Sequence, residues 1–310
     1  MSSLRIAFAG SPAVAVPTLD ALRASRHDVV SVVTRADSRV GRRGVLAPTP
    51  VAVRGESAGL PVVKADRLDA ATTDAILATE PDLGVIVAYG GLVREPLLSG
   101  PRLGWINLHF SLLPRWRGAA PVQHAILAGD EETGVSVFQL VPELDAGPVY
   151  ASVTAPIGRF QSAGSLLQQL ADLGADVLVR VVDALADGTA IGEAQTGEPS
   201  YAGKLGVDDG ALDWTQPADL LHRRIRAMTP EPGASTTLHG QRFKILDAAP
   251  AHDGPALEPG RIAFHDRRVL VGTGAGTLEL LRVTPFGKSP MPAADWVRGR
   301  PRGQETVLGG

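Results

Sequence analysis

The sequence predicts a doubly wound α/β domain followed by a small antiparallel β domain. Short β-branched strands alternate with helical stretches in the first half of the chain, a polar, Gly-rich stretch interrupts this pattern near residue 200, and short strands separated by turns follow. The chain has 310 residues, and at about 150 residues per domain this length predicts two domains. We expect the domains at residues 1–190 and 211–310, with a linker over 191–210.

The expected strands of the first domain are apolar on both faces, which is typical of buried parallel strands. They lie at residues 4–9, 29–34, 60–63, 83–88, 105–109 and 135–141. Helices are expected between and after them at 12–24, 49–58, 68–80 with Asp69 as N-cap, 120–128 and 162–186. Strand and helix alternate, so the domain is predicted to form an open doubly wound sheet.

The pattern changes after the stretch 187–210, which is rich in Gly and polar residues. An amphipathic helix is expected over 217–228, with Leu221, Ile225 and Met228 on one face. Short strands are expected at 234–238, 241–246, 260–264, 268–272 and 276–283. Their length and spacing predict a small antiparallel barrel, which in an α/β enzyme is commonly an accessory binding module.

Composition excludes several classes of function. The chain contains no cysteine, which excludes disulfides, thiolate nucleophiles, cysteine-ligated zinc and iron–sulfur clusters. No dense His/Asp/Glu cluster offers a metal site, and no signal peptide or long apolar run is present. We therefore expect a cytoplasmic protein with no metal and no membrane contact. The net charge of -3 gives no general reason to expect a nucleic-acid partner.

Sequence motifs narrow the enzyme classes further. The first turn between strand and helix, FAGSP at 8–12, lacks the G-x-G-x-x-G spacing of dinucleotide-binding proteins. Walker A, G-x-S-x-G and H-E-x-x-H are absent from the sequence. Nicotinamide dehydrogenases, kinases of the P-loop type, serine hydrolases and zinc proteases are therefore disfavoured.

The segment 105–124, WINLHFSLLPRWRGAAPVQH, is the strongest candidate for chemistry, because a buried strand ends in polar residues and opens into a loop. Asn107 and His109 are two residues apart, so on a strand they face the same side. The alternative is that Asn107 satisfies backbone groups and His109 is a hydrogen-bonded core histidine. Asp145, in PELDAG after the strand at 135–141, is either a site residue or an ordinary turn aspartate.

Three motifs resemble the folate-dependent formyltransferases: NLH at 107–109, SLLPRWRGAAP at 111–121 and LDAG at 144–147. This family has a catalytic set of Asn, His and Asp, so the resemblance implies Asn107, His109 and Asp145. Further matches at 8–12, 87–90, 225–227 with Pro230, and 287–288 are similar to the members that formylate initiator methionyl-tRNA from 10-formyltetrahydrofolate. The resemblance implies a Rossmann-like formyltransferase domain, a C-terminal OB-like β-barrel that binds tRNA, and no metal or protein partner, so we expect a monomer.

The resemblance also assigns roles within the site. Formyl transfer needs a donor to the developing oxyanion, which suits Asn107, and a group that moves a proton near neutral pH, which suits His109. Asp145 would either orient the imidazole or take the amine proton through water. The folate is expected to contact two segments: Ser111, Leu112, Leu113 and Pro114, and a second wall of Val87, Ala88, Tyr89 and Gly90.

Two groups of arginines are expected to contact the tRNA. The loop 35–46 corresponds to a basic insertion of the family that reaches the acceptor end, and here it carries Arg42 and Arg43. It departs from the family because Gly44 and Val45 stand where relatives often carry lysines. The second group is on the helix of the C-terminal domain, at Arg223, Arg224 and Arg226. The alternative for both groups is a solvated surface without a ligand.

Other functions remain open at this point. Other folate formyltransferases act on a ribonucleotide amine or an amino sugar, and a related hydrolase releases formate, but these have no need of the C-terminal module. A non-catalytic RNA-binding protein with the same two folds would leave the set of Asn107, His109 and Asp145 unexplained.

Overall fold

The computed structural model describes residues 2–40, 44–300 and 306–309. Its contacts divide the chain into two compact units. Unit 1 comprises Met1–Pro121, Glu132–Pro156 and Leu167–Ala202, and unit 2 comprises Val122–Glu131, Ile157–Leu166 and Gly203–Gly310. None of the helices in the described ranges is both long enough and apolar enough to cross a membrane.

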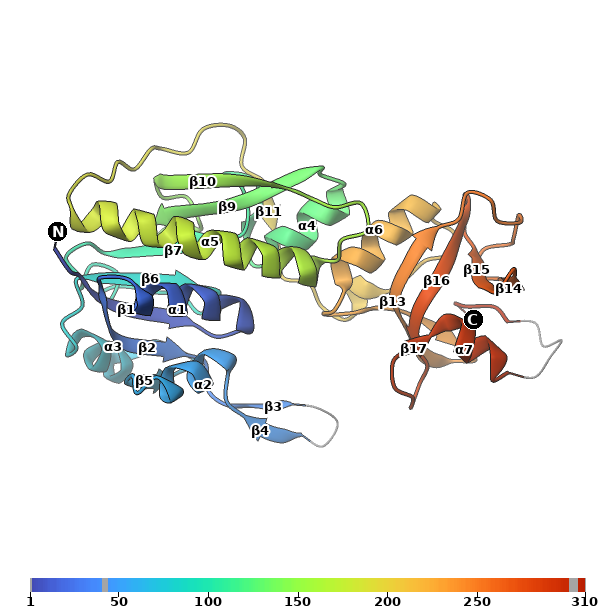
Figure 1. Cartoon of the computed structure of the whole chain (residues 1–310), viewed down its shortest axis with the longest axis horizontal. Coiled ribbons are helices and arrows are strands. Elements are labelled where there is room, and N and C mark those ends of the chain that lie inside the picture. Colours follow the sequence, from blue (N-terminus) through green and yellow to red (C-terminus); the bar gives the residue numbers. More distant parts are fainter. Residues whose placement is uncertain (1, 41–43, 301–305, 310) are drawn as a thin grey trace. The chain divides into compact units, whose positions relative to one another are not determined.

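A seven-stranded sheet forms the centre of unit 1, in the order β10-β9-β7-β6-β1-β2-β5 (Figure 1). Its strands are β1 (Arg5–Gly10), β2 (Asp28–Thr34), β5 (Val62–Lys64), β6 (Leu83–Val87), β7 (Trp105–His109), β9 (Glu132–Gln139) and β10 (Val149–Pro156). The five strands from β5 to β7 are parallel, whereas β9 and β10 are antiparallel. The Rossmann-like parallel sheet is therefore confirmed, with an antiparallel edge that the sequence analysis did not predict.

Helices separate the strands largely where the sequence predicts them. They are η1 (Ala13–Ala15), α1 (Val16–Ala24), α2 (Pro50–Ser57), α3 (Ala70–Leu77), α4 (Pro121–Ala128) and α5 (Ala163–Ala186). The Asp69 carboxylate accepts a hydrogen bond from the Thr72 N–H at 2.9 Å, so the predicted N-cap of α3 is confirmed. The Thr49 hydroxyl caps α2 in the same way by accepting from Ala52 N–H at 3.0 Å.

The predicted site segments at 87–90 and 107–114 lie at the carboxyl ends of β6 and β7. From β1 the chain continues to β2 and β5 on one side and then returns to β6 on the other, so β1 lies at the topological switch point where ligands bind in such folds. Leu108 packs closely against Gly174 of α5, because a Cβ added to this glycine would lie only 2.7 Å from Leu108 Cδ2. Because strand residues alternate, Asn107 and His109 face the opposite side of the sheet.

Two short strand pairs complete unit 1. The loop 35–46 forms β3 (Ser38–Val40) and β4 (Val45–Ala47), which extend away from the main sheet (Figure 1). Arg42 and Arg43 lie outside the described residues. A second pair, β8 (Arg117–Gly118) and β11 (Tyr201–Ala202), joins the loop after β7 to a segment far away in the sequence.

Unit 2 contains an antiparallel sheet in the order β12-β13-β16-β15-β14, with β17 paired to β16. Its elements are η2 (Asp208–Gly210), α6 (Ala218–Met228), β12 (Ala234–Leu238), β13 (Gln241–Pro250), β14 (Ile262–His265), β15 (Arg268–Gly272), β16 (Thr277–Thr284), β17 (Met291–Pro292) and α7 (Ala293–Arg298). In the described ranges no strand pairing joins β12 to β14, so the predicted closed barrel is not confirmed.

The C-terminal residues 306–309 make hydrogen bonds near both edge strands of this sheet, β14 and β12. Leu308 N–H donates to the Gly260 carbonyl at 2.8 Å beside β14, and Gly309 N–H donates to the Thr237 carbonyl of β12 at 2.9 Å. Strand length and spacing predict an antiparallel β domain, but they do not determine closure, because closure depends on how far the terminal strands curve toward each other.

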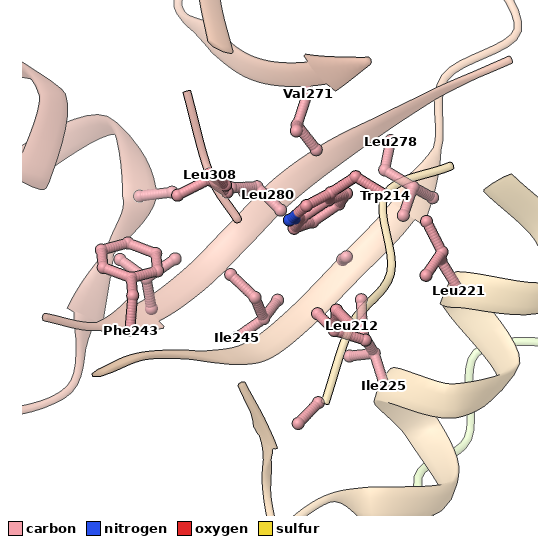
Figure 2. Packing of buried hydrophobic residues seen from close by; sticks show 14 of the residues in the cluster. Leu212, Trp214, Leu221, Ile225, Phe243, Ile245, Val271, Leu278, Leu280 and Leu308 are labelled. Atoms are coloured by element: carbon pink, nitrogen blue, oxygen red, sulfur yellow. The ribbon is translucent and has the colours of Figure 1, made fainter. Parts of the chain in front are cut away.

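The core of unit 2 surrounds the indole of Trp214, with Leu221 and Ile225 of α6 on one side and sheet residues on the other (Figure 2). The Trp214 Nε1–H donates to the Thr236 hydroxyl at 3.0 Å, which satisfies its one polar atom inside this core. The predicted apolar face of the helix is confirmed, since Leu221, Ile225 and Met228 are all buried.

One buried residue of α6 is polar. His222 is 5% exposed, its ring lies 5.6 Å from that of Phe160, and its Nε2 has no hydrogen-bond partner in the part of the chain described. Burial lowers the pKa of His222 to about 4, and the nearby charge of Arg226 lowers it as well. The imidazole is therefore neutral in the folded protein near pH 7.

We expect His222 to make unit 2 sensitive to acid. Between its unfolded pKa of about 6.5 and the folded pKa of about 4, the unfolded chain binds a proton that the folded chain does not. The free energy of unfolding should therefore fall as pH decreases through this window, by up to about 1.4 kcal/mol per pH unit. His222→Leu should reduce this slope in urea titrations between pH 7 and 4, whereas the same change at the exposed His252 should not. A slope that stays at the wild-type value in His222→Leu would contradict this account.

Candidate active site

His109 ends β7 and is 6% exposed. Its Nε2 lies 2.9 Å from the Trp116 carbonyl oxygen. A carbonyl only accepts, so Nε2 carries the proton and a neutral ring keeps Nδ1 as an acceptor. Burial lowers the pKa of His109 below its usual 6.5, although the charge of Asp145 acts in the opposite direction. The site therefore holds a neutral imidazole near pH 7, which can accept a proton at Nδ1.

Asp145 lies in the loop after β9 and turns its carboxylate toward this histidine. Its Oδ2 is 4.0 Å from His109 Nδ1, which is too long for a hydrogen bond but close enough for the carboxylate charge to raise the pKa of the ring. The same oxygen accepts a hydrogen bond from the Gly118 N–H at 2.8 Å. This partner is 27 residues away in the sequence, so a long-range contact holds the Asp145 carboxylate.

Asn107 lies two residues before His109 on β7, so both side chains are on the same face of the sheet. It is half-buried, opposite Phe138 of β9. Within the described ranges its side-chain amide makes no hydrogen bond, so both of its N–H groups and its oxygen are available to a ligand. The structure thus brings His109 and Asp145 together and places Asn107 on the same side of the sheet.

The loop 111–114 has one buried residue and three that a ligand can reach. Ser111 is fully buried, and its hydroxyl donates to the Arg115 carbonyl at 2.6 Å. Ser136 of β9 binds the backbone of this loop at two points. Its hydroxyl donates to the Ser111 carbonyl at 2.8 Å and accepts from Leu113 N–H at 3.2 Å. Leu112, Leu113 and Pro114 are half-buried and are the members available for contact with a ligand.

In the second predicted wall, alternate residues face outward. Val87 and Tyr89 are buried, and the Tyr89 hydroxyl donates to the Ala65 carbonyl at 2.8 Å, so this side chain belongs to the core. Ala88 and Gly90 are exposed. The turn is held in place by Arg35, whose Nη1 donates to the Gly90 carbonyl at 3.2 Å.

The three arginines of α6, in unit 2, have different surroundings. Arg223 is half-buried. Arg224 is exposed and donates to the Asp209 carbonyl at 2.9 Å. Arg226 is half-buried, and its Nη1 donates to the carbonyls of Gly158 at 3.3 Å and Gln161 at 3.1 Å. Burial lowers the pKa of Arg226, followed by the charge of Arg223. Arg226 therefore secures backbone within unit 2, whereas Arg224 faces solvent.

Two polar residues with a part in this site were missed by the sequence analysis. Ser136 could have been noticed, because it is a lone serine inside the buried strand VSVFQ. Gln195 could not, since it lies in the polar stretch assigned as a linker and has no periodic signal. Its side chain donates to the carbonyls of Asp145 and Gly147, which are 50 and 48 residues away in the sequence. Within the described part of the chain, no group of three or more His, Asp or Glu side chains could hold a metal ion.

We expect Gly118→Ala to disturb both the fold and the site. Gly118 has φ +120°, and a Cβ there would lie 2.6 Å from the Ala202 carbonyl oxygen. The change should lower the free energy of unfolding by about 1–3 kcal/mol and move the N–H that holds Asp145, so that turnover falls as well. Gly188→Ala is the matched control, because Gly188 has φ +69° and a Cβ added there would meet no other atom within 4 Å. Equal turnover in both variants would show that the Gly118 contact has no role in the site.

Two family matches cover most of the chain. Residues 4–182 match the formyl transferase family and residues 204–301 match the formyl transferase C-terminal domain. The chain is 55% identical over 296 residues to a methionyl-tRNA formyltransferase of Clavibacter sepedonicus, covering 96% of this chain and 97% of the relative. It is 54% identical over 305 residues to one of Leifsonia xyli subsp. xyli, covering 98% and 100%.

Solved structures share the fold at low sequence identity. HypX from Aquifex aeolicus in complex with tetrahydrofolic acid has a TM-score of 0.68 at 18% identity, covering 99% of this chain and 51% of that one. An N-formyltransferase from Helicobacter canadensis, in complex with folinic acid and dTDP-3-aminofucose, has a TM-score of 0.67 at 15% identity, covering 89% and 98%. With a parallel sheet, an antiparallel C-terminal sheet and family matches over both, the chain belongs to the formyl transferase family.

Proposed function

We propose that this chain transfers a formyl group from 10-formyltetrahydrofolate to the free amino group of initiator methionyl-tRNA, producing N-formylmethionyl-tRNA for translation initiation. The observation that carries this proposal is the 50–55% identity to methionyl-tRNA formyltransferases over 96–98% of the chain, including the C-terminal unit. The resemblance of the sequence motifs and the pairing of His109 with Asp145 support it.

The residues around β7 provide what formyl transfer to an amine requires. The folate co-substrate supplies the formyl carbon, and attack by the amine places negative charge on the formyl oxygen. The side-chain amide of Asn107 can donate an N–H to that oxygen, and one such donor contributes about 3–4 kcal/mol in other enzymes. Asn107 is therefore proposed to stabilise the oxyanion.

His109 is suited to accept the proton that the amine loses. Its ring is neutral because burial lowers its pKa, and its Nε2–H is occupied by the Trp116 carbonyl, so Nδ1 is the accepting atom. The carboxylate of Asp145 at 4.0 Å would stabilise the imidazolium that forms. Asp145 either acts in this way or takes the amine proton through water. General base catalysis of this kind typically contributes about 10²–10⁴ in rate.

The exposed members of the two predicted folate segments are proposed to hold the co-substrate. Leu112, Leu113 and Pro114 present apolar surface that suits a flat ring system, and Ala88 and Gly90 present backbone. The buried Ser111, Val87 and Tyr89 are proposed to support these contacts from within the fold.

Unit 2 is proposed to bind the tRNA. We also propose an OB-like barrel, domains at 1–190 and 211–310 joined by the linker 191–210, a monomer and a cytoplasmic location. The part of this linker up to Ala202 packs on unit 1. The hydrogen bonds from residues 306–309 to Gly260 and Thr237 support a barrel-like curvature of the C-terminal sheet. Arg42 and Arg43 are proposed to reach the acceptor end, and Arg224 to contact phosphate.

Incubation with 10-formyltetrahydrofolate and initiator methionyl-tRNA tests the reaction, with acid gels or mass analysis of the aminoacyl group as the readout. We expect formylmethionine in the wild type, and kcat reduced at least about a hundredfold in Asn107→Ala and in His109→Ala, because each removes a group that acts in the transition state. Circular dichroism should show that both variants are folded, and His252→Ala, at an exposed position, serves as control.

Two results would contradict this assignment. A folded His109→Ala enzyme with near-normal turnover would remove the histidine from the mechanism. A wild-type enzyme that formylates an amino-sugar nucleotide or a ribonucleotide amine, but not methionyl-tRNA, would replace the proposed acceptor.

The arginines of α6 should separate binding from stability. If Arg224 contacts a phosphate, Arg224→Ala should weaken tRNA binding and reduce the slope of log affinity against log salt by about 0.9, with Tm unchanged. Arg226→Ala should instead lower Tm, because Arg226 holds two backbone carbonyls of unit 2. Arg42→Ala with Arg43→Ala should lower kcat as well as affinity, since that loop is proposed to position the reacting end. A flat salt response in wild type and Arg224→Ala would place the tRNA on another surface.

A further inference from the structure

Gln195 makes four hydrogen bonds at the back of the Asp145 loop. Its side-chain Nε2 donates to the Asp145 carbonyl at 2.8 Å and to the Gly147 carbonyl at 2.9 Å. Its Oε1 accepts from Arg117 Nη2 at 2.6 Å and from Arg117 Nε at 3.2 Å. The amide therefore uses both of its donors and its acceptor, and it connects the loop that carries Asp145 to the strand β8.

The segment around Gln195 is attached firmly to unit 1 on both sides. Before it, Glu193 exchanges two backbone hydrogen bonds with Val149 of β10, at 2.8 and 2.9 Å. After it, the Ser200 hydroxyl accepts from Trp116 N–H at 2.9 Å, and β11 pairs with β8. Gln195 thus projects from a fixed backbone.

The Asp145 loop needs such support. Asp145 has φ +47°, a left-handed conformation that residues other than glycine adopt only occasionally, aspartate more often than most. Gly147 approaches the neighbouring strand so closely that a Cβ would lie 1.8 Å from the Gln139 carbonyl oxygen. The carboxylate has one hydrogen bond from Gly118 N–H, and Gly118 follows Arg117, the other partner of Gln195. The Gln195 side chain therefore contacts the backbone of Asp145 directly. It also contacts Arg117, the residue before Gly118, whose N–H donates to the Asp145 carboxylate.

We propose that Gln195 is a positioning residue for the formyl transfer reaction: it fixes the Asp145 loop against β8 so that the Asp145 carboxylate faces His109 Nδ1. This proposal rests on the catalytic role proposed for Asp145. Gln195 itself does not contact the reacting groups in this arrangement, so its effect must pass through Asp145.

Two substitutions separate the contacts of Gln195. Gln195→Glu keeps the size and the acceptor for Arg117 but loses the two N–H donors and places a carboxylate against two carbonyl oxygens. Gln195→Met keeps the length of the side chain without either function. Thr196→Ala, at the exposed neighbouring residue, and Gln168→Glu, at an exposed glutamine of α5, are the matched controls.

We expect kcat for formylation to fall about tenfold to a hundredfold in Gln195→Glu and Gln195→Met, because a small displacement of a catalytic group is costly. KM for both substrates should stay within about twofold, and the controls should keep full activity. In an Asp145→Asn background, Gln195→Met should cause little further loss, since the group through which it acts is already absent. An equal loss in both backgrounds, or unchanged kcat in both Gln195 variants, would overturn the proposal.

A second measurement needs no substrate, so it remains informative if the proposed acceptor is wrong. The pKa of His109 is followed by NMR of its ring nitrogens, assigned with His109→Gln. Asp145 is the charge that raises the pKa of this ring, and the hydrogen bond to the Trp116 carbonyl raises it as well. The ring of Phe138 lies 6.3 Å from that of His109 and carries no charge. Gln195→Met should lower the pKa of His109 in the same direction as Asp145→Asn. An unchanged pKa in Gln195→Met would overturn the proposal, whereas failure of the wild type to formylate methionyl-tRNA would overturn only the proposed function.

Discussion

The Asp145 carboxylate lies 4.0 Å from His109 Nδ1, and the arrangement of unit 1 depends on this contact. A buried imidazole is disfavoured as a cation, and the nearby carboxylate of Asp145 acts against that cost, as does the hydrogen bond to the Trp116 carbonyl. Holding the carboxylate there requires a left-handed backbone at Asp145, a glycine at 118 that can approach Ala202, and a close approach at Gly147. The segments at 117–118, 145–147 and 195–202 are therefore parts of a single structure, although they are distant in the sequence.

The parallel sheet supplies the rigid part of this arrangement. His109 and Asn107 belong to β7, which lies between β6 and β9, and Ser136 of β9 supports the loop that follows. Reactive groups on a strand are positioned by the ladder of backbone hydrogen bonds, whereas Asp145 is on a loop and depends on side-chain contacts for its place. This difference explains why the supporting contacts gather around Asp145.

Unit 2 shows how a charged residue can have a structural use. Arg226 places its guanidinium against two carbonyls, and the buried His222 next to it stays neutral. Arg224, two positions earlier, remains in solvent. Arginines that look alike in the sequence of α6 therefore have different surroundings: Arg226 supports the integrity of the unit, and Arg224 is the one that we propose for contact with the tRNA.

The sequence by itself determined many of the elements and the chemistry of the motifs. An apolar run predicted β7 with its bounds, and a polar residue before a helical stretch predicted Asp69 as an N-cap. Both predictions succeed because local periodicity and capping depend only on neighbouring residues. The NLH, SLLP and LDAG motifs indicated the family. Only the tertiary structure decided that β9 and β10 are antiparallel, that Tyr89 and Ser111 are buried supports, that no strand ladder closes the C-terminal sheet within the described ranges, and that Gln195 contacts Asp145. Each of these depends on residues brought together from distant parts of the chain, and local sequence patterns carry no record of such contacts.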